Sequence, residues 1–400
     1  MNILFLTLAD IKNIEEHDIY QDLLRFFKSQ GHNIYIATCV EKKEKQNTVQ
    51  YISQECNILR IQIGNQSNCS LIEKGISTIT LKSRYLNAIN KYFKHVNFDL
   101  ILYSTPPVTL ASVIKKLKNR YKCRTYLMLK DIFPQNAIDL GMIKENGLIY
   151  KYFRQMEKKL YDISDYIGCM SKENAKYLLS HNEILSDKVE ICPNALIPRK
   201  IEYISKEDID YTKSLLNIPK NKKVFVYGGN LGKPQGVEFI TECLSVLEKD
   251  DRIFTIIVGN GSEYKYLEET IKNKSFKNIR LLNKLPREEY FNLLKIADVG
   301  FVFLDYRFTI PNFPSRILPY MENSIPIACV VDKTTDVGKI AKNNNFGWYC
   351  YSNNILDFKN MIEEIMSSDI KKIGHNARKY LEENYNVEVC YSRIVDKLRK

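Results

Sequence analysis

Several features that would mark other classes of protein are missing from this sequence. No run of about 18 apolar residues occurs, so no segment is expected to span a membrane. Glycine and proline are few, 16 and 12 of 400 residues, which excludes a collagen-like chain and a long flexible linker. The first residues hold one short apolar stretch that meets Asp10, with no basic segment before it. They predict a first buried strand and not a signal peptide.

The ten cysteines lack the spacing of a metal site. No two of them form a C-x-x-C pair, which argues against a zinc ribbon or a thioredoxin-like motif. They lie mostly inside apolar runs, as Cys39 and Cys169 do. We therefore interpret them as buried, reduced thiols of a cytoplasmic protein.

The sequence does have a globular composition and a strong positive charge. Hydrophobic residues make up 44% and charged residues 26%, as in folded domains. At about 150 residues per domain, the length predicts two to three domains. The 59 basic and 47 acidic residues give a net charge of +12. Such a charge predicts an anionic partner: nucleic acid, an anionic membrane surface or a phosphorylated substrate.

Short apolar runs alternate with helical patterns along the chain, which predicts parallel, doubly wound α/β sheets. Predicted strands cover 2–7, 33–39, 99–104, 124–129, 166–170, 224–227, 253–258, 279–282, 299–303 and 327–331. Predicted helices cover 20–30, 111–121, 148–163, 238–247, 287–296 and 315–321, and residues 373–398 form a helical tail. The alternation breaks near residue 200. We therefore predict two similar domains, 1–200 and 201–372, with a tail over 373–400 that packs back towards the first.

Three polar segments of the second half each follow a predicted strand. Ligands of parallel sheets bind beyond the carboxyl ends of strands, and glycines let backbone amides approach phosphate oxygens. The spacing matches neither G-x-G-x-x-G nor a Walker A loop, and a simple glycine-rich turn is the alternative. The residues expected to bind an anion are Gly229, Asn230, Lys233 and Gln235, then Gly259, Asn260 and Gly261, then Pro314, Ser315 and Arg316.

The third segment contains an electrostatic conflict. Ser315 is expected to be the N-cap of a helix over 315–321, which places Arg316 in the first turn. There its charge opposes the helix dipole. An anionic ligand at that terminus would resolve the conflict. The alternative is a surface arginine screened by solvent.

In this order, the three segments resemble those of a GT-B-fold glycosyltransferase of family 4, and more narrowly the bacterial enzymes of capsule and O-antigen synthesis. In that family a Gly-rich loop, a VGxGxxxxxL segment and a helix ending in a G-x-P-I/V turn form the nucleotide-sugar site. Segments 229–236, 258–267 and 315–327 are similar to these. In the first half, 130–134 (KDIFP) and 191–194 (ICPN) also resemble the narrower group.

The resemblance implies a fold and a reaction. It implies two Rossmann-like domains facing across a cleft, with the nucleotide sugar on the second and the acceptor on the first. The reaction is a retaining transfer, without a metal, from a UDP-linked donor to a polyprenyl-diphosphate-linked or other glycan acceptor. Lys233, Arg316 and the amides of Gly229 and Asn230 would stabilise the departing diphosphate. Backbone groups near Leu285 would contact the base.

The sequence departs from the family pattern in the donor segments. The arginine and lysine that the family usually carries in the first loop fall on Asn230 and Gln235, so we expect Lys233 to supply the phosphate charge. The family's paired glutamates fall on two prolines, at 311 and 319. Ribose and sugar contacts are therefore expected from Glu322.

The acceptor side also differs, because no histidine follows the fourth strand of the first domain. Asp131 directly follows a predicted strand, and we expect it to act as the acid or base there. Lys130 and Asn136 share its loop, and His17 lies in the polar loop after the first strand. These four residues are predicted to bind the acceptor. For Asp131, a helix cap or a salt bridge is the alternative.

The positive charge is uneven along the chain. Residues 1–200 hold 29 basic and 20 acidic residues, net +9, whereas 201–400 carry net +3. Basic residues cluster at 115–130 and, between tyrosines and phenylalanine, at 150–161. This pattern suits an anionic bilayer, so we expect a peripheral protein at the inner face of the plasma membrane. A solvated basic face is the alternative.

Two other functions stay open on the sequence. A nucleotide-sugar epimerase of GT-B-like fold would use a similar donor site. A nucleic-acid-binding protein would suit the charge. However, no helix-turn-helix, RNP or zinc signature is visible, so we expect no nucleic-acid partner.

Overall fold

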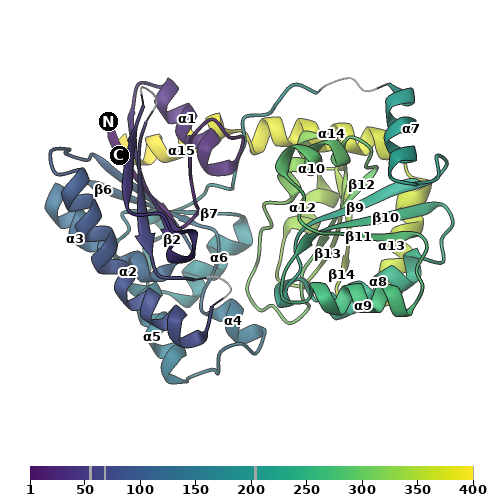
Figure 1. The fold of residues 1–400 in the computed structure, drawn as a ribbon, viewed down its shortest axis with the longest axis horizontal. Coiled ribbons are helices and arrows are strands. Elements are labelled where there is room, and N and C mark those ends of the chain that lie inside the picture. The colour runs from purple at the N-terminus through teal and green to yellow at the C-terminus, as the bar shows by residue number, and fades with distance from the viewer. Residues whose placement is uncertain (54–55, 67–68, 202–204, 400) are drawn as a thin grey trace. The chain divides into compact units, whose positions relative to one another are not determined.

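The chain divides into two compact units in the computed structural model, which describes residues 1–400 except 54–55, 67–68, 202–204 and 400 (Figure 1). Unit 1 comprises Met1–Ile197 and Asn386–Lys400, and unit 2 comprises Pro198–Tyr385. Each unit has its own parallel sheet covered by helices. The expected fold class, two doubly wound α/β domains, is confirmed.

Unit 1 is built on an eight-stranded sheet in the order β3-β4-β2-β1-β5-β6-β7-β8. All neighbouring strands are parallel except β3 and β4. The strands are β1 (Asn2–Leu6), β2 (Asn33–Glu41), β3 (Val49–Ile52), β4 (Asn57–Ile63), β5 (Leu100–Ser104), β6 (Arg124–Leu129), β7 (Tyr166–Cys169) and β8 (Val189–Ile191). Side chains alternate between the two faces of the sheet, as in β1, where Leu4 packs into one core and Phe5 into the other.

Helices cover both faces of this sheet. The core that contains Leu4 lies under α2 (Leu71–Tyr92), α3 (Ala111–Tyr121), α5 (Leu148–Ile163) and α6 (Lys172–His181). The core that contains Phe5 lies under α1 (Ile19–Ser29) and α15 (Val387–Arg399). The short α4 (Gln135–Asp139) follows β6, and one-turn 3₁₀ helices cover Lys42–Glu44, Val108–Leu110 and Ser186–Lys188. Gly31 follows the end of α1 with φ +82°, the left-handed conformation that glycine adopts after a helix.

Unit 2 has a six-stranded parallel sheet in the order β11-β10-β9-β12-β13-β14. Its strands are β9 (Lys223–Asn230), β10 (Ile253–Asn260), β11 (Ile279–Leu282), β12 (Val299–Phe303), β13 (Ile327–Val331) and β14 (Gly347–Tyr351). Its helices are α7 (Lys206–Leu215), α8 (Val237–Leu247), α9 (Tyr264–Asn273), α10 (Arg287–Leu294), α11 (Ile317–Glu322), α12 (Val337–Asn343), α13 (Ile355–Ser367), α14 (Ile370–Asn384) and a 3₁₀ turn at Lys233–Gln235. The strand order reverses at β9, which places a topological switch point, the usual ligand position, at its carboxyl end.

The start of α11 corrects one expectation. The N-cap is Arg316 and not Ser315, and no side chain caps this terminus. The reason is Pro319, which lacks an N–H group. With the N-cap at residue 316, Pro319 occupies the third helical position, where no intrahelical donor is needed. With Ser315 as the N-cap, the proline would remove a helical hydrogen bond.

The expected helical tail consists of two helices that belong to different units. α14 lies in unit 2 and α15 in unit 1. The chain enters unit 1 through a parallel bridge between Leu196 and Asn386, where the Val387 N–H donates to the Leu196 carbonyl at 3.1 Å. Within the described part of the chain, no helix is long and apolar enough to cross a bilayer.

Candidate functional site

The last residues of β9, 228–230, and the end of β10 with the residue that follows it, 259–261, form a glycine-rich border that we call the β9–β10 edge. The two strands stay in parallel register to their ends, so that Gly259 lies opposite Gly229. A Cβ atom on Gly259 would come within 1.9 Å of the Gly229 carbonyl oxygen. Only glycine fits there, and the two predicted segments are held against each other by this close approach.

Arg316 brings the third predicted segment to the same edge. Its guanidinium carbon lies 4.7 Å from the centroid of the Tyr227 ring, and its Nη1 would lie 2.8 Å from a Cβ on Gly229. Nη1 is buried and has no hydrogen-bond partner among the described residues. Leaving a buried donor without a partner costs about 1–3 kcal/mol, or more for a charged group. An anionic acceptor at this edge would remove that cost.

Three tyrosines that the sequence analysis did not single out surround Arg316. The Tyr320 hydroxyl accepts a hydrogen bond from the Gly228 N–H at 2.9 Å, and Tyr290 interacts with Tyr320. Burial raises the pKa of Tyr320 to about 12 and also raises that of Tyr227. The phenols therefore stay neutral and leave the positive charge of Arg316 uncompensated. Tyr320 follows Arg316 by about one helical turn, and this spacing was the signal in the sequence that could have predicted that the two side chains lie close together.

The side chains of Asn230 and Gln235 are engaged within their own loop. The buried Gln235 side chain accepts hydrogen bonds through Oε1 from the Gly232 N–H at 3.1 Å and from Asn230 Nδ2 at 3.2 Å. The Tyr227 hydroxyl donates to the Asn230 carbonyl at 2.7 Å. These contacts fix the shape of the loop and position its backbone. Asn230 and Gln235 stand at the positions where the resembling family usually carries arginine and lysine, and here their side chains stabilise the loop.

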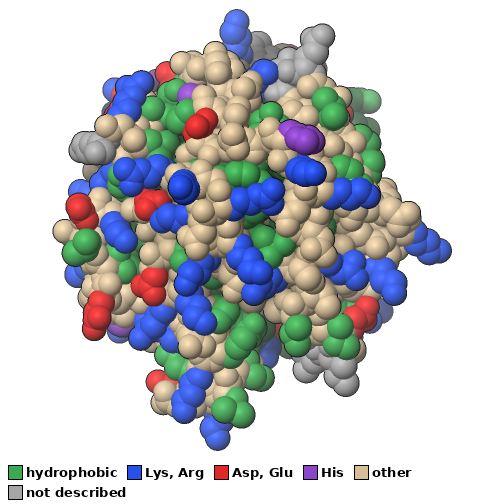
Figure 2. Space-filling view, turned by 90° about the vertical axis from the view of Figure 1, so that its left-hand side faces the viewer, with side chains coloured by type: hydrophobic (Ala, Val, Ile, Leu, Met, Phe, Trp, Pro, Cys, Tyr) green, Lys and Arg blue, Asp and Glu red, His purple; other side chains and the backbone are tan. Residues whose placement is uncertain are grey.

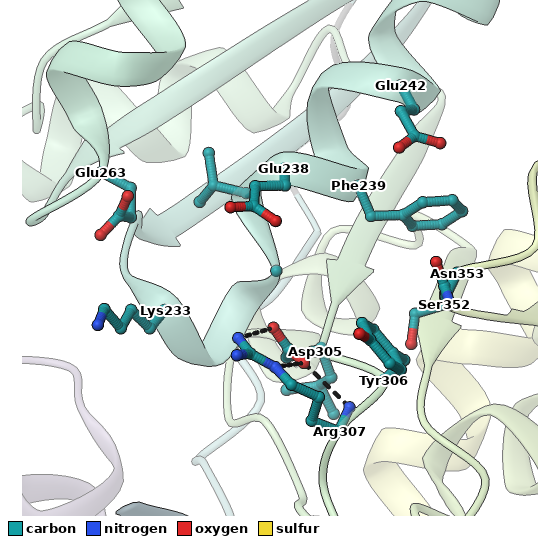
Figure 3. A pocket seen from close by; sticks show the side chains of 13 residues that line it. Lys233, Glu238, Phe239, Glu242, Glu263, Asp305, Tyr306, Arg307, Ser352 and Asn353 are labelled. Carbon is teal, nitrogen blue, oxygen red and sulfur yellow. Dashed lines mark hydrogen bonds and ion pairs between the residues drawn. The ribbon is translucent and has the colours of Figure 1, made fainter. Parts of the chain in front are cut away.

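Lys233 lies on the rim of a pocket of about 310 Å³ (Figure 3). The pocket opens beyond the carboxyl ends of β9, β10, β12 and β14, at the start of α8. At one side of it, Asp305 and Arg307 form an ion pair at 2.7 Å. Acidic groups predominate, which disfavours a diphosphate here. The charged lining residues are Lys233, Glu238, Glu242, Glu263, Asp305 and Arg307. The cationic side chain that lies next to Gly229 is therefore that of Arg316 and not that of Lys233.

The other residues predicted to bind the donor are more dispersed. The buried carboxylate of Glu322 accepts the Arg199 N–H at 2.9 Å and pairs with the Arg199 guanidinium at 3.2 Å. A contact between Glu322 and a ribose would require this pair to open. Leu285 is half-buried between β11 and α10, and Pro314 and Ser315 are half-buried in the segment before α11.

In unit 1, Lys130, Asp131 and Asn136 follow the carboxyl end of β6. Thr105 Oγ1 accepts the N–H groups of Lys130 and Asp131 at 3.0 and 3.2 Å. The Lys130 ammonium lies 3.8 Å from the centroid of the Tyr20 ring, a cation–π contact. Tyr20, which was not predicted, thus orients Lys130.

The polar groups of this loop are incompletely satisfied. Neither Lys130 Nζ nor Asn136 Oδ1 has a hydrogen-bond partner among the residues that the structure describes, and both atoms are buried. Burial raises the pKa of Asp131, and the nearby Lys130 charge opposes that shift. An anionic group of a ligand would satisfy the buried ammonium, and a hydroxyl group of the same ligand could donate to the amide oxygen or to the partly buried carboxyl. We call these three residues the β6 loop site.

His17 is engaged elsewhere in unit 1. Its Nδ1 lies 2.8 Å from Oδ2 of the fully buried Asp22, which also pairs with Arg25. The same carboxylate oxygen accepts the Ile197 N–H at 2.8 Å. His17 therefore helps to fasten the loop after β1 to α1 and to the last residues before unit 2.

No group of three or more His, Cys, Asp or Glu side chains that could hold a metal ion occurs in the described part of the chain. The donor that the structure shows without a hydrogen-bond partner at the β9–β10 edge, among the described residues, is the guanidinium Nη1 of Arg316. Such a donor is suited to phosphate oxygens, which accept hydrogen bonds, and not to a metal cation.

The chain is similar in sequence to known glycosyltransferases. Residues 208–385 match the family described as glycosyl transferases group 1. The chain is 23% identical over 347 residues to a probable glycosyltransferase, WbjE, of Pseudomonas aeruginosa, covering 86% of this chain and 83% of that protein. It is 23% identical over 206 residues to a putative colanic acid biosynthesis glycosyl transferase, WcaI, of Escherichia coli, covering 51% of this chain and 50% of that protein.

Solved structures share the whole fold. Sucrose-phosphate synthase from Thermosynechococcus elongatus superposes with a TM-score of 0.79 at 14% identity, covering 100% of this chain and 98% of that one. HepE of Anabaena, solved in complex with UDP-glucose, gives a TM-score of 0.71 at 14% identity, covering 100% and 99%. This arrangement of two parallel-sheet units is the GT-B fold. The protein is therefore a glycosyltransferase with the GT-B fold, and its residues 208–385 match the family of glycosyl transferases group 1.

Proposed function

We propose that the chain is a retaining hexosyltransferase of family 4 that acts in the synthesis of a bacterial surface polysaccharide such as capsule or O-antigen. It would move a sugar from a UDP-linked donor to a polyprenyl-diphosphate-linked glycan. The names of WbjE and WcaI and the UDP-glucose complex of HepE support this proposal. The observation that carries it is the buried, unpartnered Nη1 of Arg316 at the β9–β10 edge.

On the donor side, the proposal assigns the diphosphate to this edge. Arg316 would stabilise the negative charge that develops as the sugar–phosphate bond breaks, because its guanidinium is preorganised by the Tyr227 ring. The backbone N–H groups of Gly229 and Asn230 would add neutral donors. Lys233, on the exposed rim of its pocket, would act through longer-range attraction of the phosphates. No metal is part of the proposed mechanism.

On the acceptor side, the proposal assigns the β6 loop site of unit 1. The Lys130 ammonium would bind a phosphate of the acceptor, and Asp131 would orient or deprotonate the attacking hydroxyl. A raised pKa makes the Asp131 carboxylate a better base than an exposed one, because its proton affinity is closer to that of the group it serves. In the proposed division of labour, residues 1–200 bind the acceptor and 201–372 bind the nucleotide sugar.

A transfer assay tests the proposal. The protein is incubated with a panel of UDP- and GDP-linked sugars and a polyprenyl-diphosphate-linked monosaccharide, and the product is identified by mass spectrometry. The anomeric configuration of the new bond, read by NMR, should match that of the donor. A parallel reaction without acceptor should leave the nucleotide sugar unchanged, whereas an epimerase would convert it. Conversion without acceptor, or an inverted product, would contradict the proposal.

A further inference from the structure

The positive charge of the first 200 residues is concentrated on three helices. α2, α3 and α5 together contain twelve Lys or Arg and three Asp or Glu, a net charge of +9. That equals the net charge of residues 1–200 as a whole, which have 29 basic and 20 acidic residues. The remaining residues of that half are therefore neutral on balance, with 17 of each sign. The excess charge of the first 200 residues is thus carried by these three helices.

These three helices form one layer of unit 1. Their buried side chains, among them Tyr85 of α2, Ile114 of α3 and Leu160 of α5, share one core on the same face of the sheet. Their opposite sides face outward together. Figure 2 looks onto the side of the molecule where α2 and α3 lie in Figure 1, and Lys and Arg side chains predominate there, with hydrophobic side chains between them.

Large apolar side chains are exposed at one end of this layer. Leu148 is 87% exposed and Ile149 62% exposed in the first turn of α5, and Ile79 is 75% exposed in the first half of α2. A helix that follows a parallel strand and returns along the sheet begins at the carboxyl edge of that sheet. Among the described residues, the exposed large apolar side chains of the layer and of the segment before α5 are Ile76, Ile79, Met142, Leu148, Ile149 and Tyr152. We call them the apolar rim.

A groove between α2 and α3 adjoins the rim at Ile79. Its volume is about 370 Å³. Among the described residues that line it, Lys82, Lys116 and Arg120 are cationic and none is acidic. Grouped cations beside exposed aliphatic side chains are the pattern of a surface that meets anionic lipid headgroups and the acyl chains below them.

We propose that the outer face of α2, α3 and α5 docks onto an anionic lipid bilayer, with the apolar rim inserted among the headgroups and the groove occupied by lipid phosphates. The net charge argues against a second copy of this chain as the occupant, since two such faces would repel each other. The α4–α5 segment that carries Met142 and Leu148 continues directly from the β6 loop site. Docking would thus hold Lys130 near the level of the headgroups. This last step rests on the proposed function, because a lipid-linked acceptor presents its diphosphate there.

Vesicle binding tests the proposal on the full chain. Flotation is measured with phosphatidylcholine vesicles and with 70:30 phosphatidylcholine:phosphatidylglycerol vesicles, at low and high NaCl. We expect binding to the anionic vesicles that weakens at high salt, since surface electrostatics are screened over about 10 Å at 0.1 M. Leu148→Glu and Ile149→Glu should each weaken it about tenfold or more by the loss of apolar insertion. Leu356→Glu, which changes a leucine of α13 in unit 2 that is 63% exposed, close to the 62% of Ile149, is the matched control.

The outcomes are distinct. Equal binding of the rim variants and the wild type, or equal binding to neutral and anionic vesicles, would overturn the proposal. So would a rim-dependent dimer, detected by light scattering, in a protein that ignores vesicles. UDP binding by the same preparations separates this test from the proposed function, because the rim variants should keep wild-type affinity. Failure of the wild-type protein to bind UDP would count against the donor site and leave the vesicle result standing.

Discussion

Replacing Arg316 with alanine should weaken the binding of UDP and leave the binding of uridine nearly unchanged. The guanidinium Nη1 is buried without a hydrogen-bond partner, so its removal breaks no contact made by that atom in the free protein. What is lost is a charge-assisted hydrogen bond to phosphate, about 1.5–3 kcal/mol. This corresponds to a Kd for UDP raised about 10- to 150-fold. Uridine carries no phosphate and therefore reports the base and ribose contacts alone.

Isothermal titration with UDP and uridine measures both effects on one preparation. Arg252→Ala is the control, because Arg252 lies on the surface of the same unit, paired with Asp250 and Glu363 at 2.7 Å. Arg316→Lys should fall between wild type and alanine, since lysine keeps the charge and loses the planar fork. A UDP affinity within twofold of wild type in Arg316→Ala, or an equal loss for uridine, would refute the assignment of the diphosphate to this edge.

Three further predictions concern the glycines and the β6 loop site. Gly259→Ala should lower Tm and abolish UDP binding, because the new methyl would lie 1.9 Å from the Gly229 carbonyl; normal thermal stability would contradict the observed strand packing. Lys130→Met should raise the KM for a diphosphate-bearing acceptor about tenfold, the effect of one lost charge-assisted contact, with Tm unchanged or higher because a buried ammonium is removed. An unchanged acceptor KM would remove Lys130 from the site. Since burial raises the pKa of Asp131, its charged form destabilises the folded chain above the ordinary carboxyl pKa of 3.8. Asp131→Asn should therefore raise Tm at pH 7 and have no effect below about pH 3; a lower Tm at pH 7 would show that the carboxylate is stabilising.

The part of the site that the sequence predicted depends on local signals. Glycines at the ends of apolar strands, as at 228–229 and 259–261, indicate both a strand terminus and a close backbone approach. The parallel order of the strands then brings those termini together. Arg316 was predicted for a related reason, since its position at a helix start is unfavourable without an anion. Both inferences need only neighbouring residues and the topology.

The part that the sequence could not give depends on contacts between distant residues. Glu322 pairs with Arg199, which lies 123 positions earlier, so nothing near Glu322 reveals that its carboxylate is occupied. The interaction of Tyr290 with Arg316 also joins residues that are distant in the sequence, so nothing near either residue predicts it. Helix α2 received no prediction, although its buried residues Leu81, Tyr85, Ala88 and Ile89 have the spacing of an amphipathic helix and were a local signal for it. The N-cap at residue 316 could likewise have been predicted from the sequence, because Pro319 lies in the same helical turn.

The return of α15 to unit 1 has a consequence for synthesis on the ribosome. Val387, Cys390 and Ile394 belong to the same core as Phe5 and Leu24, yet the 188 residues of unit 2 are translated in between. At about 5–20 residues per second, the nascent first unit waits roughly 10–40 s with the part of that sheet face that α15 covers still exposed beside α1. An apolar sheet face exposed for so long is a substrate for chaperones and for aggregation. Expression yield should thus respond to changes in α15 more strongly than the size of that helix would suggest.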